Sequence, residues 1–362
     1  MKPIYIVILI ILSTVFNANA QKGKNKNVTD IDEQETMIET QMRQLEKYYN
    51  SGRYSNALKI AKQINNSNVK LDPETNQLFL KYYICSLKEM SYDEEADSAT
   101  IEFTKKYPFY KPTKFDQPVF KDLLSNFYTR PRLAIWISGG VPSPIIQVDT
   151  VHLVGDTTQI MPDYSQTKGT SAEIALQFFP FKYFSVALGL HYMYFEYTRD
   201  RQQNITTFSY NEKNHRLSVP LYFIATMPTQ EGKWVPELML GAQADYLLKT
   251  TYTASTKYNQ NQHFASSGNT ELIEKNKINY TANAGIRLNY NHKQLSFFID
   301  NTFRYTIKPF NNSEYNLNNN DLVYNQLFVP DAIHLITYTM QIGIKISFGY
   351  TTFTKYGYGY GR

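Results

Sequence analysis

Long apolar runs are scarce in this chain of 362 residues. The stretch from Ile4 to Phe16 is too short to cross a bilayer as a helix, and no later segment is longer. Cysteine is nearly absent: Cys85 stands alone, which excludes an internal disulfide. Excess charge of one sign is also lacking, because the net charge of +5 is small and spread along the chain, so nothing indicates a nucleic-acid partner. Any membrane crossing must therefore be made by strands.

Recognisable catalytic and metal-binding motifs are missing as well. The six histidines show no pair at the spacing of metal ligands, and neither a Gly-x-Ser-x-Gly elbow nor a glycine-rich phosphate loop occurs. We therefore expect no catalytic residue, no cofactor and no metal site. His215 and Asp200 are the only candidates for a catalytic rim, and a structural role in a loop is the alternative for both.

The first residues have the pattern of a secretory signal. Lys2 precedes the apolar run, and Ala18-Asn19-Ala20 resembles a cleavage site, so residues 1–20 are predicted to be removed on export. Residues 21–35 are polar and poor in apolar side chains, which predicts a flexible lead-in.

Residues 36–129 have the 3.6-residue period of helices. Ile38, Met42, Leu45 and Tyr49 fall on one helix face, and Asp72-Pro73 starts another helix. Two helical hairpins, offset by about 38 residues, resemble degenerate tetratricopeptide (TPR) repeats, whose period is 34. Such modules present faces for protein partners, so we expect a small all-α module that binds a protein.

An aromatic stretch held extended by prolines follows the second hairpin. It contains Tyr107, Phe109 and Tyr110, the candidate partner-binding residues. The alternative is that these rings pack against the module itself, since two small hairpins hardly enclose a core unaided.

From residue 130 to 352 apolar and polar residues alternate in stretches that predict strands. Eight such stretches are found, at about 132–142, 170–180, 183–197, 215–227, 234–253, 277–290, 295–308 and 333–350. Short breaks alternate with longer ones centred near 157, 206, 265 and 322. An even number of strands with apolar and aromatic outer faces predicts an antiparallel transmembrane β-barrel of eight strands. A soluble barrel of lipocalin type, with the faces reversed, is the structural rival.

In a transmembrane barrel the polar face points inward. Short turns would face the periplasm and long loops the outside, which leaves the helical module in the periplasm. An eight-stranded barrel is wide enough only for its own side chains, so the charges should pair as a polar network rather than line an open pore. The predicted luminal residues are Glu173, His191, Arg216, Glu237, Asp245, Lys249, Arg287, Asp300, Arg304 and Lys345. A narrow gated channel or an acid-base site is the alternative use of the same groups.

The segment Leu217-Ser218-Val219-Pro220-Leu221-Tyr222-Phe223, followed by Leu240-Gly241-Ala242-Gln243-Ala244-Asp245-Tyr246, resembles the PorT-like outer-membrane β-barrel family of Bacteroidota. The resemblance covers roughly residues 130–352 and implies an outer-membrane protein, some of whose relatives serve protein secretion. The helical front module departs from the simplest members. Residues 353–362, rich in tyrosine and glycine, are predicted to form a flexible tail.

The sequence thus predicts a mainly β, non-enzymatic outer-membrane protein. Its barrel would contact membrane lipid, and its periplasmic helical module would bind a protein partner of the periplasm or the outer membrane, as an adaptor or part of a cell-envelope or secretion assembly. The alternatives are an outer-membrane enzyme or gated channel, and an adhesin that acts through the Asn- and Tyr-rich loops.

Overall fold

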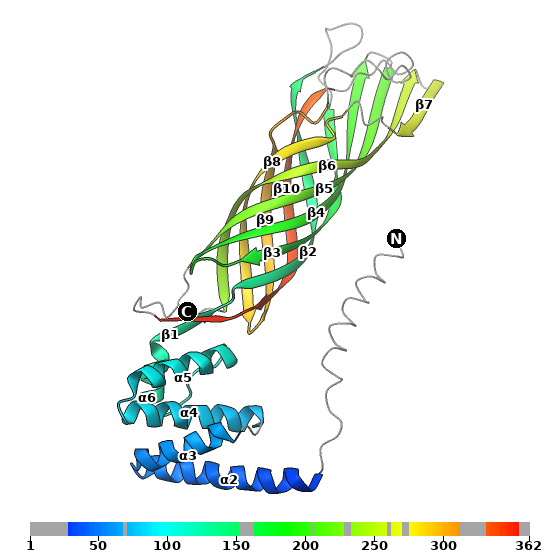
Figure 1. Cartoon of the computed structure of the whole chain (residues 1–362). Helices are drawn as coiled ribbons and strands as arrows, with labels where there is room; N and C mark the ends of the chain where they lie inside the picture. Colours follow the sequence, from blue (N-terminus) through cyan, green and yellow to red (C-terminus); the bar gives the residue numbers. More distant parts are fainter. Residues whose placement is uncertain are drawn as a thin grey trace. The chain divides into compact units, whose positions relative to one another are not determined.

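The computed structural model describes residues 28–67, 71–151, 163–203, 206–227, 233–258, 262–269, 275–311 and 331–354. The chain divides into two compact units, Met1–Tyr128 with Thr352–Arg362, and Thr129–Thr351. Figure 1 shows helices in the first unit and strands in the second. The predicted signal peptide at 1–20 lies outside the described residues, as does the tail from residue 355.

The helical unit is built from consecutive helices that pack against one another, α2 with α3 and α4 with α5. The helices are α2 Val28–Asn50, α3 Tyr54–Asn66, α4 Pro73–Glu89, α5 Asp93–Lys106 and α6 Pro118–Ser125. The Asp72 carboxylate caps α4 by accepting from the Glu74 amide at 3.0 Å. The α2 helix begins at Val28, so the predicted lead-in of 21–35 is wrong over its second part: polar composition alone did not prevent a helix there. No helix among these residues has the length and apolar composition needed to cross a membrane.

The last strand of the chain returns to the helical unit. Strand β11 (Thr351–Thr354) pairs with β1 (Phe127–Arg130). The hydroxyls of Thr104 and Thr352 are 2.8 Å apart, and the rings of Tyr128 and Phe353 stack at 5.7 Å. The flexible tail predicted from 353 is therefore wrong for residues 353 and 354, because strand pairing orders them.

The β unit is a ring of eight antiparallel strands. They are β2 Leu133–Thr150, β3 Asp163–Phe178, β4 Phe184–Gln203, β5 Thr206–Thr226, β6 Trp234–Tyr258, β8 Ile278–His292, β9 Leu295–Thr306 and β10 Ala332–Phe348. The first strand, β2, pairs with the last, β10, and β5 also pairs with β6, so the strands form a ring. The short β7 (Gln262–Asn269) pairs with the end of β6. The prediction of eight strands is confirmed.

Several strands are longer than predicted. Strand β4 continues to Gln203 and β5 begins at Thr206, so the long break expected near 206 is wrong. The break expected near 265 is occupied by β7. These extensions alternate as strands do, but with polar residues on the outer face. Strand ends predicted from an apolar outer face were therefore placed too early. Strand β6 has 25 residues, whereas a membrane-spanning strand needs about 9 to 11.

The outer wall of the ring is apolar at one end and polar at the other, and the interior changes from mainly charged to mainly aromatic in the same direction. We call the end with the short connections after β3, β5 and β8 the turn half, and the other end the loop half. In the turn half of β4, Leu188 and Leu190 face outward and His191 inward. In the loop half, Glu196 and Asp200 face outward while Phe195 is fully buried inside. The inversion falls at the row formed by Tyr194, His215 and Lys249, which lie opposite one another on β4, β5 and β6.

Candidate functional site

The interior of the turn half is the candidate site. It holds as many acids as bases, all buried: Glu173, Glu237, Asp245 and Asp300 with Arg216, Arg287, Arg304 and Lys345. His191 is buried beside them and lies opposite Glu173 in the register of β3 and β4. Neighbouring strands place these side chains together because every second residue of a strand points inward.

Lys249 is the exception among the predicted luminal residues, and its placement inside was wrong. The register of β5 and β6 shifts between His215 and Arg216: Arg216 lies opposite Leu247, and His215 lies opposite Lys249. Leu248 is the extra residue of this bulge, so Leu248 and Lys249 are both exposed. One inserted residue reverses the alternation, so Lys249 lies on the outside.

Arg287 has the most elaborate setting in the interior. Its Nη2 and Nε atoms donate to Oδ2 of Asp300 at 2.8 and 3.2 Å. Its guanidinium also lies 4.2 Å from the Trp136 ring centroid and 4.0 Å from that of Phe298. Phe298 fits because Gly343 on β10 leaves the space that a Cβ would fill. Ion pairing and ring contact together compensate for the desolvation of this cation.

Two further ion pairs cross the interior. Lys345 Nζ lies 2.9 Å from the Glu237 carboxylate, and Arg304 lies 3.5 Å from Glu173, to which the Tyr222 hydroxyl also donates. The remaining acid accepts hydrogen bonds instead. Asp245 receives them from Ser218, Gln243 and Thr281. The network spans facing strands and therefore ties the wall of the ring together.

Aromatic side chains fill the interior of the loop half. The buried cluster comprises Met193, Phe195, Tyr197, Phe208, Tyr210, Leu247, Tyr252, Ala254, Phe310, Ile333 and Leu335. Lys275, outside the strands, reaches into it and pairs with Glu212 at 2.7 Å. Arg199 pairs with Asp331 at 2.8 Å. Packed rings above paired charges favour a filled interior over a wide aqueous pore.

The two rim candidates do not come together. His215 lies on the outer wall, where its Nδ1 atom is 2.7 Å from the Tyr192 hydroxyl. Asp200 is exposed and lies opposite Ser209, six residues along β5 from His215. A charge relay between them would need hydrogen-bonding distance. Among the residues that the structure describes, no group of three acidic, histidine or cysteine side chains is placed to hold a metal ion.

In the helical unit two of the three predicted partner-binding rings turn toward their own core. Tyr107 and Tyr110 pack around the buried Phe103, at ring distances of 5.1 and 5.2 Å. Phe109 is half-buried. Sequence reasoning missed Phe115, whose side chain is 95% exposed. Its proximity to Lys111, Pro112 and Lys114 was a usable signal, because an apolar ring in a polar loop has no helix face to bury it.

A buried carboxylate holds the Phe115 loop in shape. Asp116 accepts from Lys81 at 2.7 Å, from the Tyr110 hydroxyl at 2.5 Å and from the Thr113 amide at 2.5 Å. Burial acts to raise the pKa of Asp116, but these donors outweigh it and lower the pKa to about 2. Phe115 is thus an aromatic presented on a fixed loop, the arrangement typical of an interface anchor.

No protein-family model and no curated protein matches this chain. Solved structures similar to it include Neisserial surface protein A, with 10% identity over 59% of this chain and 99% of that chain at a TM-score of 0.28. A second is OprG of Pseudomonas aeruginosa, with 11% identity over 60% of this chain and 97% of that chain at a TM-score of 0.32. A third is a major outer membrane protein of Thermus thermophilus, with 12% identity over 59% of this chain and 99% of that chain at a TM-score of 0.31. The fold assignment itself rests on the strand pairings described above.

Proposed function

We propose that this protein is an outer-membrane barrel that anchors a periplasmic helical module, and that the module binds a protein partner in a cell-envelope or secretion assembly. The observation that carries the anchoring role is the interior: the turn half buries four acids and four bases, three of each joined as ion pairs, and rings pack the loop half. A barrel of this kind holds position in a membrane without conducting. The apolar outer wall of the turn half supports the membrane placement.

The binding role rests on the helical unit. Its paired helices support the likeness to TPR repeats, and the exposed ring of Phe115 offers an anchor that its own core does not use. The PorT-like resemblance of residues 130–352 agrees with a place in secretion in Bacteroidota. The enzyme alternative is weaker, since His215 and Asp200 lie apart on the outer wall.

Site-specific photocrosslinking in the native envelope tests the binding role. A photoreactive phenylalanine analogue at position 115 should give one defined crosslinked protein, and the analogue at Tyr92, also exposed but outside the loop, should not give that product. Phe115→Ala should then reduce recovery of that protein about thirtyfold, the effect of an interface hot spot of about 2 kcal/mol. Crosslinking that is equal at both positions, with recovery unchanged in Phe115→Ala, contradicts the role.

Electrical recording tests the anchoring role against the gated channel. The purified full chain in a planar bilayer should give no steady ionic current, because the interior is filled. A reproducible conductance that disappears in a variant of a luminal residue, such as Arg304→Gln, would replace the anchor with a channel.

A further inference from the structure

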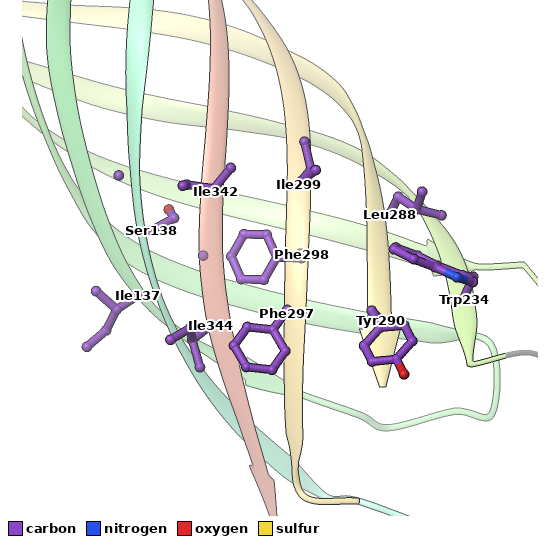
Figure 2. Close-up of a pocket in the computed structure, with 12 residues that line it drawn as sticks. Ile137, Ser138, Trp234, Leu288, Tyr290, Phe297, Phe298, Ile299, Ile342 and Ile344 are labelled. Carbon is purple, nitrogen blue, oxygen red and sulfur yellow. The ribbon is translucent and has the colours of Figure 1, made fainter. Parts of the chain in front are cut away.

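The outer wall of the turn half carries a groove of about 590 Å³ across strands β2, β10, β9 and β8. Figure 2 shows Ile342 and Ile344 of β10 beside Phe297 and Ile299 of β9, with Trp234 and Tyr290 at one side. Ile342 is 64% exposed although it is apolar. The groove is therefore part of the surface that the proposed function places in lipid.

A glycine in the wall creates the hollow. The register places Gly139, Ile342, Ile299 and Leu288 opposite one another in one row around the ring. Gly139 is the only one of these four positions without a side chain. A Cβ at Gly139 would meet just the Ser171 carbonyl oxygen, at an ordinary 3.8 Å. Packing of the wall does not demand this glycine, and the open space is available to a ligand.

Polar groups suited to a lipid headgroup gather at the aromatic end. The Trp234 and Tyr290 rings are 5.0 Å apart, and Lys233 Nζ lies 5.9 Å from the Tyr290 ring centroid. The Asn291 amide donates to the Lys233 carbonyl at 2.8 Å, which fixes the backbone here, and Lys293 is exposed in the turn between β8 and β9. Tryptophan and tyrosine settle at the headgroup level of a bilayer, and lysine binds phosphate as a point charge.

We propose that this groove is a binding site for an anionic glycerophospholipid. One acyl chain lies along the apolar row beside Gly139, and the phosphate lies beside Lys233 between the headgroup-level rings. The groove is apolar along its length and cationic at one end, which matches the polarity of this ligand. The inference rests on the proposed function for the membrane placement, and it adds that one lipid is held in preference to the bulk bilayer.

Fluorescence quenching tests the site directly. The full chain is reconstituted in phosphatidylcholine vesicles containing a small fraction of phosphatidylglycerol with brominated acyl chains. Bromine quenches tryptophan on contact, and the chain has two tryptophans. Trp136 is fully buried inside the ring, so a Trp234→Phe variant supplies its signal for subtraction. Trp234 should be quenched as though brominated phosphatidylglycerol were enriched about fivefold over brominated phosphatidylcholine, the effect of one lysine near an anionic lipid.

Three variants separate the parts of the site. Gly139→Phe should fill the groove without backbone strain and abolish the enrichment. Lys233→Gln should remove the preference for phosphatidylglycerol and keep the quenching by brominated phosphatidylcholine. Ala242→Leu, an outward position on β6 opposite Ala282, adds bulk to the wall away from the groove and should leave the enrichment unchanged.

Equal quenching by both lipids in the wild type and in Gly139→Phe would overturn the proposal. So would crosslinking in vesicles that shows a dimer abolished by Gly139→Phe, because the groove would then hold a second copy of the chain. A complete lack of quenching by any brominated lipid is a different result, since it removes the membrane placement and the proposed function with it. If the photoreactive analogue at position 115 gives no crosslinked protein, the proposed partner binding fails but the lipid site is unaffected.

Discussion

The turn half and the loop half of the ring are built from the same strands but differ in what they mainly bury: charged groups beside one apolar cluster in the first, aromatic and aliphatic groups beside two ion pairs in the second. On β10, Lys345 and Gln341 point inward in the turn half, whereas Leu335 and Ile333 point inward in the loop half. The backbone geometry is the same, and the proposed placement of the turn half in lipid accounts for the difference. Where lipid covers the wall, apolar groups gain nothing by turning in; where water covers it, burial of apolar surface drives packing.

The comparison also locates the boundary between the apolar and the polar outer wall. Tyr192, Tyr246, Tyr280 and Tyr305 are exposed close to the inversion, whereas Tyr252, beyond it, is buried. Beyond the row of Tyr194, His215 and Lys249 the same strands enclose the apolar cluster of the loop half. The packed rings of the loop half therefore close one end of the charged interior of the turn half.

Breaking an ion pair in the turn half should have the largest effect. Asp300→Ala leaves Arg287 charged and buried, which should destabilise the barrel by about 3–5 kcal/mol. The measurement is urea unfolding in lipid vesicles, followed by the gel shift between folded and unfolded barrel. Asp200→Ala removes an exposed acid and is the matched control. Equal stability of the two variants would show that the interior is hydrated and that the polarity contrast is weaker than described.

A lysine placed on the outer wall tests where the apolar wall of the turn half ends. Ile342→Lys places a charge in the apolar wall and should cost about 2–4 kcal/mol in the same assay, as at a bilayer midplane. Thr253→Lys, on the exposed outer wall of the loop half, should change stability by less than about 0.5 kcal/mol. Similar costs at both positions would contradict the inversion. Spin labels at Ala282, Ile299 and Ile342 should report lipid, and a label at Thr253 should report water.

The helical unit is a second region that buries apolar groups, and Asp116 gives it a smaller, pH-dependent test. The folded pKa of about 2 lies below the ordinary value of 3.8. The carboxylate therefore contributes stability that is fully present above the ordinary pKa and is lost as the pH falls toward 2. The loss should be about 2 kcal/mol, measured by thermal unfolding of the helical signal between pH 5 and 2. Asp116→Asn should flatten this dependence, and an unchanged slope would contradict it.

The last prediction concerns the rate at which a thiol-reactive probe modifies Cys85. Burial raises its thiol pKa to about 12, and the residue is fully buried in the helical core. A thiol-reactive probe should therefore modify the native chain much more slowly than the chain in urea. Rapid labelling under native conditions would show that the helical unit opens easily.

The sequence by itself determined the ring and its faces. Alternation in Ile278–His292 specified which residues of β8 point outward, because successive side chains of a strand leave on opposite faces whatever surrounds them. The count of eight strands and the helices around Leu45 and Ile84 followed from equally local periods.

Only the tertiary structure decided which charges meet, where the faces invert and which ring stays free. Lys249 moved outside through a bulge whose position depends on the pairing of β5 with β6. The pairing of Arg287 with Asp300 depends on the register of β8 with β9. Tyr110 is drawn inward and Phe115 left outward by a hydrogen bond network centred on Asp116. Each of these outcomes arises from strand register or from side-chain hydrogen bonds between separate segments, and a local period carries no information about such contacts.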